Sequence, residues 1–254
     1  SCLGAYSRQV PIPGKSNKLA FGWAKKVFTA FENTQGFDSE KTTVVGNPIL
    51  KEVLEGNTEL AKDIFNVTMT KPIMLFWGGS QGAQPLNDFV LIMLNELLQS
   101  YEIIHVCGKK NHREVAEQAN FIVRQELEKY YHLWEFLDET PLKHALKVAD
   151  LVVSRAGSGS IFEIAACGKP SILVPLPSAA NNHQSKNAYE YQRAGATIII
   201  EQDNLNPHLF LEKVRYLFSN PTELETMKQN ALAFAKPMAA KAIAREILEF
   251  LNAY

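Results

Sequence analysis

The sequence has few cysteines, and their scarcity excludes one class of protein. Three cysteines stand at positions 2, 107 and 167, far apart and without any CxxC spacing. An odd number of isolated cysteines does not supply the disulfide framework of a small secreted domain. We therefore expect a protein of a reducing compartment, the cytoplasm.

Long uncharged hydrophobic runs are also missing. The longest apolar stretch, Phe89 to Leu98, contains Asn95 and Glu96, and a transmembrane helix needs ~20 predominantly apolar residues. The chain begins without an initiator methionine and without a charged segment that leads into an apolar signal core. We expect no membrane span, and a chain that starts partway through a longer gene product.

Neither sign of charge is in excess. The 26 Lys and Arg residues oppose 27 Asp and Glu residues, so the formal net charge is −1. This balance gives no global electrostatic reason to expect a nucleic-acid partner. With 46% hydrophobic and 21% charged residues in a chain of 254, the composition excludes whole-chain disorder and suits one large or two small folded domains.

Short apolar segments alternate with helical ones along most of the chain. We predict six strands over 73–77, 101–106, 134–137, 151–154, 171–174 and 196–200, with helices over 86–98, 112–128, 141–148 and 161–167. Earlier segments predict a helix over 16–24, strands over 26–31 and 42–45, and a polar helical stretch over 51–70; an amphipathic helix over 239–251 ends the chain. This order predicts an α/β fold with a parallel sheet, which binds ligands at the carboxyl ends of its strands.

A glycine-rich segment, GGSQGA over 78–83, follows the apolar strand 73–77. Small residues let a ligand approach the backbone, and the following helix would direct N–H groups at an anion. The segment lacks the GK[ST] ending of a P-loop and the GxGxxG spacing of a dinucleotide site. A tight turn without a ligand explains it equally well.

A second glycine-rich junction, SRAGSGS over 154–160, follows the strand 151–154. Two such junctions in one sheet can hold both ends of a diphosphate-containing ligand. Ser160 and Glu163 also match the S-x-x-E capping box, in which the glutamate folds back onto the amides of its own helix. Glu163 therefore has two interpretations: a helix cap, or an acceptor for the hydroxyls of a ribose.

Polar side chains follow the strand 171–174. His183, Gln184 and Asn187 can donate and accept hydrogen bonds, which suits the recognition of sugar hydroxyls. A surface loop that leads into the next helix is the other interpretation.

Two further groupings of residues do not indicate a ligand site. His105, Cys107 and His112 lack the spacing of a zinc site, so we expect neither a metal nor another cofactor. The first 31 residues hold five basic residues and no acidic one, interleaved with aromatics. The weak helical amphipathicity of this segment favours an ordinary solvated surface over a membrane-binding patch.

The ordered motifs resemble those of the MurG family. They are PGKSNK over 13–18, GNP over 46–48, GGSQGA over 78–83, SRAG over 154–157 with Glu163, and HQ over 183–184 with NA over 187–188. That family transfers GlcNAc from UDP-GlcNAc to lipid I at the inner face of the cytoplasmic membrane, which gives lipid II for peptidoglycan. The resemblance implies a glycosyltransferase-B fold with Rossmann-like domains, divided into a remnant of the acceptor domain (1–50), a linker (51–70), a donor-binding domain (71–236) and a helix that crosses back (237–254).

The resemblance also implies a set of donor-binding residues. Ser80 would contact the diphosphate, the backbone of Leu137 the uracil, Glu163 the ribose, and His183 with its neighbours the GlcNAc. The full set is Gly79, Ser80, Gln81, Leu137, Arg155, Gly157, Ser158, Gly159, Ser160, Glu163, His183, Gln184 and Asn187. The fold class works without a metal. The implied partners are UDP-GlcNAc, the lipid-linked acceptor and the membrane surface.

The sequence departs from the family pattern at three places. The family's N-terminal glycine-rich loop with its histidine is not in this sequence, Val10 stands where an asparagine is usual, and Leu50 where an arginine is usual. We therefore assign no catalytic residue and expect this chain alone to bind the donor without turnover. Two alternatives stay open: a non-catalytic UDP-sugar-binding subunit that needs a partner half, and a UDP-sugar epimerase of the same fold.

Overall fold

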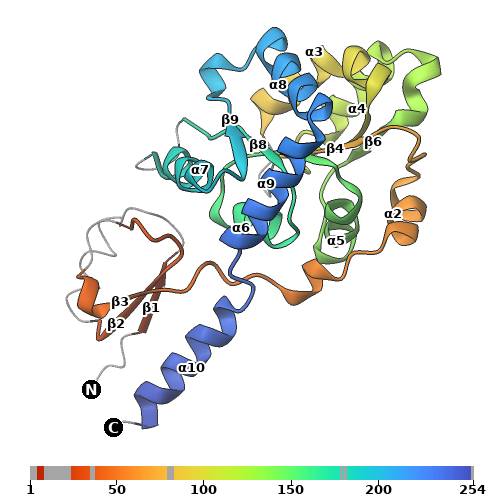
Figure 1. The fold of residues 1–254 in the computed structure, drawn as a ribbon. Coiled ribbons are helices and arrows are strands. Elements are labelled where there is room, and N and C mark those ends of the chain that lie inside the picture. Colours follow the sequence, from red (N-terminus) through yellow and green to blue (C-terminus); the bar gives the residue numbers. More distant parts are fainter. Residues whose placement is uncertain are drawn as a thin grey trace.

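The computed structural model describes residues 5–8, 24–34, 38–78, 83–177, 179 and 182–252, with the backbone alone for 5–8. Its strands form two parallel sheets (Figure 1). The smaller has the order β1 (Ala5–Arg8), β2 (Lys26–Thr29), β3 (Thr42–Val44). The larger has the order β6 (Tyr131–Trp134), β5 (Glu102–Val106), β4 (Ile73–Trp77), β7 (Leu151–Ser154), β8 (Ser171–Leu173), β9 (Thr197–Ile199). The predicted α/β fold with a parallel sheet is confirmed.

Helices connect these strands. The α-helices are α2 (Thr58–Phe65), α3 (Gln84–Ser100), α4 (His112–Ile122), α5 (Glu139–Val148), α6 (Ser158–Ala166), α7 (His183–Arg193), α8 (Pro207–Ser219), α9 (Pro221–Phe234) and α10 (Ala239–Asn252). Short 3-10 helices are η1 (Ser39–Lys41), η2 (Lys51–Leu54), η3 (Gln125–Tyr130) and η5 (Gln202–Asn204). Within the described ranges, no helix has both the length and the apolar content to cross a bilayer.

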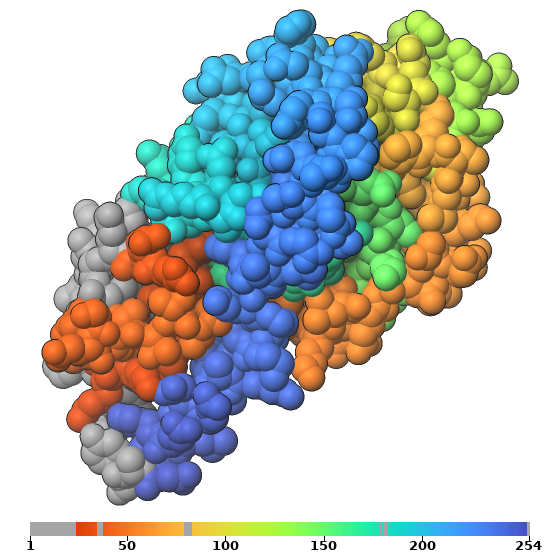
Figure 2. All heavy atoms as spheres, in the orientation of Figure 1, coloured from red at the N-terminus to blue at the C-terminus, as the bar shows by residue number. Residues whose placement is uncertain are grey.

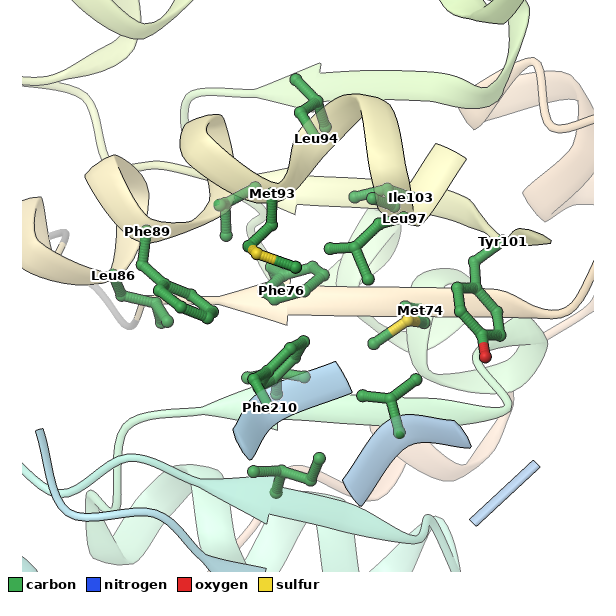
Figure 3. Packing of buried hydrophobic residues seen from close by; sticks show 14 of the residues in the cluster. Met74, Phe76, Leu86, Phe89, Met93, Leu94, Leu97, Tyr101, Ile103 and Phe210 are labelled. Atoms are coloured by element: carbon green, nitrogen blue, oxygen red, sulfur yellow. The ribbon is translucent and has the colours of Figure 1, made fainter. Parts of the chain in front are cut away.

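The central strand β4 is buried on both faces, which explains its unbroken apolar sequence. Met74 and Phe76 point to one face and pack among residues of α3 and α8; Figure 3 shows Phe76 close to Phe210 of α8. The ring centroids of Phe76 and Phe210 are 6.0 Å apart. Ile73, Leu75 and Trp77 point to the other face and pack against α2 and α5. The segment predicted as a linker thus contributes α2 to this layer.

Successive strands are added on one side of β4 and then on the other, so the strand order switches sides at β4. The chain runs outward from β4 to β5 and β6 on one side, and from β7 to β8 and β9 on the other. Open parallel sheets of this kind bind ligands in the crevice at the carboxyl ends of the two strands that flank the reversal. Here those ends are Trp77 and Ser154, which are paired in register and joined by a hydrogen bond of 2.9 Å from Ser154 Oγ to Trp77 O.

The small sheet meets the large unit through aromatic side chains. Phe31, which follows β2, lies with its ring centroid 5.4 Å from that of Phe162 in α6 and 6.2 Å from that of Phe234 in α9. Helix α10 continues beside the small sheet (Figure 1), where Glu246 forms an ion pair with Lys26. Phe162 therefore joins α6, at the switch point, to the small sheet.

Some predicted elements have other boundaries. The predicted strand over 134–137 is wrong, since β6 is Tyr131–Trp134. The prediction missed the start of β6 because this strand includes the polar His132, whose ring nitrogen lies 2.8 Å from the carboxylate of buried Glu102. The helix predicted over 112–128 ends at Ile122, where Asn95 Nδ2 donates a hydrogen bond of 2.7 Å to the Ile122 carbonyl oxygen. Helices α8 and α9 had not been predicted, and most of the predicted helix over 16–24 lies outside the described residues.

Candidate functional site

The first glycine-rich junction begins at the carboxyl end of β4. Gly78 donates its N–H to Val106 O at 3.3 Å and so follows the sheet edge. Gly79, Ser80 and Gln81 lie outside the described residues, so their predicted contacts stay predictions. The first junction starts beside the second one, because the strand ends that precede them, Trp77 and Ser154, are paired neighbours in the sheet.

Helix α6 begins at the second junction with open backbone donors. Gly157 is its N-cap and makes no side-chain cap hydrogen bond, and the first intrahelical bond runs from Ile161 N to Gly157 O at 3.0 Å. The N–H groups of the first turn, Ser158 to Ser160, are thus left for other acceptors, and the positive end of the helix dipole favours an anion. A Cβ at Gly157 would meet nothing closer than Ser160 Oγ at 3.9 Å, so the space in front of the turn is open.

Buried polar atoms surround this turn without partners. Ser158 Oγ, Asn47 Oδ1 and Asn187 Oδ1 lack a hydrogen bond in the part of the chain that the structure describes. Asn187 Nδ2 donates to Ala156 O at 3.0 Å, and Asn47 Nδ2 lies 3.8 Å from where a Cβ on Gly159 would stand. Buried polar atoms are normally paired, so unpaired ones around a helix N-terminus are consistent with a polar ligand there.

Glu163 lies one turn further along α6, in a cavity of about 590 Å³. The cavity is also lined by Trp77 at the end of β4 and by residues 136–140 and 142 after β6. Burial, with a smaller contribution from the negative charge of Glu139, raises the pKa of the Glu163 carboxyl to about 7. No hydrogen bond of this carboxylate to any described residue exists.

The start of α6 at Ser158 does not fit the capping-box interpretation of Glu163. Because α6 begins at Ser158, Ser160 lies inside the helix and cannot be its N-cap. The Glu163 side chain therefore does not reach back to cap the helix, and it remains an available acceptor that faces the cavity.

Leu137 lies in the loop between β6 and α5, and its buried side chain lines the same cavity. The end of β6 at Trp134 leaves the backbone of residues 135–138 outside the sheet ladder. Phe136, partly exposed beside it, carries Lys109 Nζ 5.1 Å from its ring centroid. The loop thus offers backbone donors and acceptors and an aromatic face opposite Glu163.

Arg155 and Gln184 have structural contacts instead of facing the cavity. The buried guanidinium of Arg155 donates to Val174 O at 3.1 Å and to Gln202 Oε1 at 2.7 Å. Gln184 Oε1 accepts from Leu176 N at 3.0 Å. Both side chains hold the loop after β8, and the donor contacts predicted for them stay predictions.

His183 begins α7 after Asn182, which has a left-handed φ of 52°. Gln184 follows in the first turn, and Asn187 lies one turn later with its side chain fully buried. Asn187 thereby holds the first turn of α6 through Ala156. The predicted sugar-binding segment is brought to the same edge of the sheet as α6.

Comparison with known proteins gives the family. Residues 73–244 match the glycosyltransferase family 28 C-terminal domain. The chain belongs to glycosyltransferase family 28.

Two relatives and one solved structure illustrate this membership. The UDP-N-acetylglucosamine–N-acetylmuramyl-(pentapeptide) pyrophosphoryl-undecaprenol N-acetylglucosamine transferase of Clostridium tetani is 34% identical over 90% of this chain, which spans 64% of that relative. The enzyme of the same name from Thermodesulfovibrio yellowstonii is 34% identical over 98% of this chain and 69% of the relative. The crystal structure of MurG from Acinetobacter baumannii superposes with a TM-score of 0.75 at 25% identity, over 96% of this chain and 66% of that one. The fold is accordingly of the glycosyltransferase-B type.

The family 28 chain shows no metal site within the described ranges, where no three His, Cys, Asp or Glu residues gather. His105 instead bonds Tyr131 OH at 2.9 Å and Asn87 Oδ1 at 3.1 Å, and its burial lowers its pKa to about 3. It is a core histidine.

Several cavity residues were missed by the sequence analysis. Trp77, Phe136 and Glu139 line the space beside Glu163, and Asn47 reaches the first turn of α6 from a distant part of the sequence. Only the GNP motif gave a signal for Asn47. The others read as ordinary ends of a strand or a helix.

Proposed function

We propose that this chain carries the donor site of an enzyme that transfers GlcNAc from UDP-GlcNAc to lipid I, giving lipid II for peptidoglycan. The observation that carries the proposal is the pairing, at the switch point of the sheet, of an uncapped α6 N-terminus with a half-buried carboxylate one turn away that no described residue hydrogen-bonds. The names of the family 28 relatives support the same substrates.

Each part of the site matches one part of the donor. The N–H groups of Ser158, Gly159 and Ser160 would bind the diphosphate, together with Ser80. Glu163, about one helical turn further, would accept hydrogen bonds from the ribose hydroxyls, and the backbone at Leu137 would bind the uracil edge. His183 would meet the GlcNAc. Gln184 and Asn187 would position the segment around it.

The chemistry is an inverting displacement without a metal. The acceptor hydroxyl attacks the anomeric carbon of GlcNAc, the bond to the diphosphate breaks, and UDP leaves with the negative charge. The dipole and N–H groups at the start of α6 stabilise that charge as it develops. A base must take the proton of the acceptor hydroxyl, and we assign it to no described residue.

The rest of the proposal concerns the whole protein. Residues 1–50 would belong to the acceptor domain, 51–70 to the connection, 71–236 to the donor domain, and 237–254 to a helix that crosses back. The Lys26–Glu246 ion pair, which joins the first and last of these, supports that division. The enzyme would work at the inner face of the cytoplasmic membrane, where its lipid acceptor lies.

Ligand-dependent melting of this chain tests the donor site. A ligand that binds only the folded state stabilises it by RT ln(1 + [L]/Kd), so millimolar UDP or UDP-GlcNAc should raise the melting temperature. ADP should raise it much less. Equal shifts with ADP, or none with UDP, would contradict the uridine assignment.

Transfer itself requires a second assay. Radiolabelled GlcNAc should move from UDP-GlcNAc to a lipid I analogue when the polypeptide also contains a family-type N-terminal segment, and stay at background with these 254 residues alone. Loss of a general base alone costs ~10²–10⁴-fold in rate. Conversion of UDP-GlcNAc to its epimer without transfer would contradict the transferase assignment and support the epimerase.

A further inference from the structure

A second cavity lies at the C-terminal ends of α5 and α6. It has a volume of about 710 Å³ and is lined by η2, the second half of α5, residues 166–170 after α6, and the first half of α9. Because Ala149 and Pro170 precede β7 and β8, the cavity opens at the amino edge of the sheet. Figure 2 shows the green surface of α5 between blue α9 and the orange segment that includes η2.

Four lysines from three parts of the chain line this cavity. They are Lys143 and Lys147 on α5, Lys169 before β8, and Lys228 on α9; the acidic residues that line it are Asp150 and Glu225. Asp150 Oδ2 accepts from Ile73 N at 2.7 Å, and Glu225 pairs with Lys228 at 3.1 Å. The lining therefore has a net charge of +2, four lysines against two carboxylates.

The fold holds these positive charges together. Lys169 Nζ donates to Lys147 O and Ala149 O, both at 2.9 Å, so its ammonium group is fixed at the end of α5. Burial lowers the pKa of Lys169, and the nearby Lys147 and Lys228 lower it further, against the opposite effects of Cys167 and Asp150. Neither Lys143 nor Lys147 forms an ion pair with a described residue. Four like charges that face only two carboxylates, both already engaged, repel one another, and a bound anion would reduce that repulsion.

The remaining walls are small, apolar or helix-terminal. Leu54 and Leu224 supply apolar surface, and α9 begins here at Pro221 without a side-chain cap on its N-terminus. The volume is within the range of ~300–1,000 Å³ that small-molecule sites occupy. An anion with a compact uncharged portion fits both features.

We propose that this cavity binds a phosphate-bearing ligand, held by Lys143, Lys147 and Lys169. It is separate from the donor site, since it lies at the other edge of the sheet, and it does not depend on the function proposed above. The phosphate could belong to a free small molecule or to a lipid headgroup, and the experiment distinguishes the two sources.

Calorimetric titration with inorganic pyrophosphate in the presence of saturating UDP tests the site. The wild-type chain should bind pyrophosphate, and Lys143→Gln/Lys147→Gln should bind roughly 30-fold more weakly, from about a fivefold loss per lysine near a phosphate. Lys62→Gln/Lys241→Gln makes the same charge change outside the cavity lining and should bind like wild type. The affinity should also fall with added salt.

Two results would overturn the proposal. One is equal pyrophosphate affinity in the wild type and both double variants, and the other is complete displacement of pyrophosphate by UDP, which would place it in the donor site. Far-UV circular dichroism verifies that the substitutions leave the fold intact.

Co-sedimentation with vesicles assigns the source of the phosphate. If headgroups are the ligand, phosphatidylglycerol vesicles should sediment the wild-type chain and retain less of Lys143→Gln/Lys147→Gln than of Lys62→Gln/Lys241→Gln. If the ligand is a free phosphate compound, the double variants should sediment alike while their pyrophosphate affinities still differ. Each result supports the site and names its source.

Discussion

Replacing Glu163 with glutamine removes a charge and nearly preserves shape. The folded state holds the pKa of Glu163 at about 7, against about 4.5 for an unfolded chain. Between these values the folded chain binds a proton that the unfolded chain has released, so the free energy of unfolding falls as the pH rises from 4.5 to 7. The full difference corresponds to ~3 kcal/mol, and partial exposure to solvent reduces it to about 1–3 kcal/mol.

Glu163→Gln should therefore be the more stable chain above pH 7 by that amount, and equal to wild type below pH 4.5. Its UDP affinity should change in the opposite direction. A lost hydrogen bond to a charged group costs ~1.5–3 kcal/mol, or about 10- to 150-fold in Kd. For the wild type, the affinity for UDP should rise through pH 7 as the carboxylate ionises.

Urea unfolding and calorimetric UDP titration at pH 5.5 to 8.5 measure both effects. Glu128→Gln, on the exposed face of η3, is the control and should match wild type in both. Glu139→Gln should move both transitions to lower pH, because it removes the neighbouring negative charge. The reasoning is refuted if Glu163→Gln binds UDP as tightly as wild type at pH 8.

Four further substitutions probe the frame around the site, each followed by urea unfolding. Phe162→Ala should lower the free energy of unfolding by ~3–5 kcal/mol, because the ring is buried between Phe31 and Phe234. A decrease below about 1 kcal/mol would show that this aromatic contact does not hold the small sheet to the large unit. Gly46→Ala should cost ~1–3 kcal/mol, because Gly46 has φ of +84° and a Cβ would lie 2.3 Å from Lys236 Cβ. Gly159→Ala, whose Cβ would make only an ordinary contact with Asn47 Nδ2 at 3.8 Å, should spare stability and weaken UDP binding. Glu102→Gln should cost ~3–5 kcal/mol at pH 7. Hydrogen bonds from His132, Thr68 and Met69 outweigh the effect of burial and lower the pKa of Glu102. The stability that these hydrogen bonds add should therefore be lost as the pH falls through the lowered pKa. If the variant is still less stable than wild type in strong acid, the assignment is contradicted.

The sequence predicted best where the physical cause was local. The strands 73–77 and 151–154 have the predicted boundaries because both are short, mainly apolar runs buried on two faces and followed by a glycine-rich segment. The strand β6 was misplaced because its polar His132 finds Glu102 on the neighbouring strand, a partner 30 positions away in sequence. No local pattern could show that pairing.

The site followed the same division. The glycine-rich start of α6 and its carboxylate were visible in the sequence, since spacing and small residues define them. The burial of the Arg155 guanidinium against the carbonyl of Val174 could not be predicted, because it depends on how the loop after β8 packs. Asn47 reaches Gly159 from more than a hundred positions away, so its part in the site depended on tertiary structure.

A crystal structure of the chain with UDP-GlcNAc tests the central claim most directly. We predict the ribose hydroxyls on the Glu163 carboxylate, the diphosphate on the N–H groups of Ser158 to Ser160, and the uracil against the backbone of Leu137. A nucleotide bound elsewhere on the molecule, or a Glu163 carboxylate that stays free of the bound nucleotide, would contradict the assignment of the donor site.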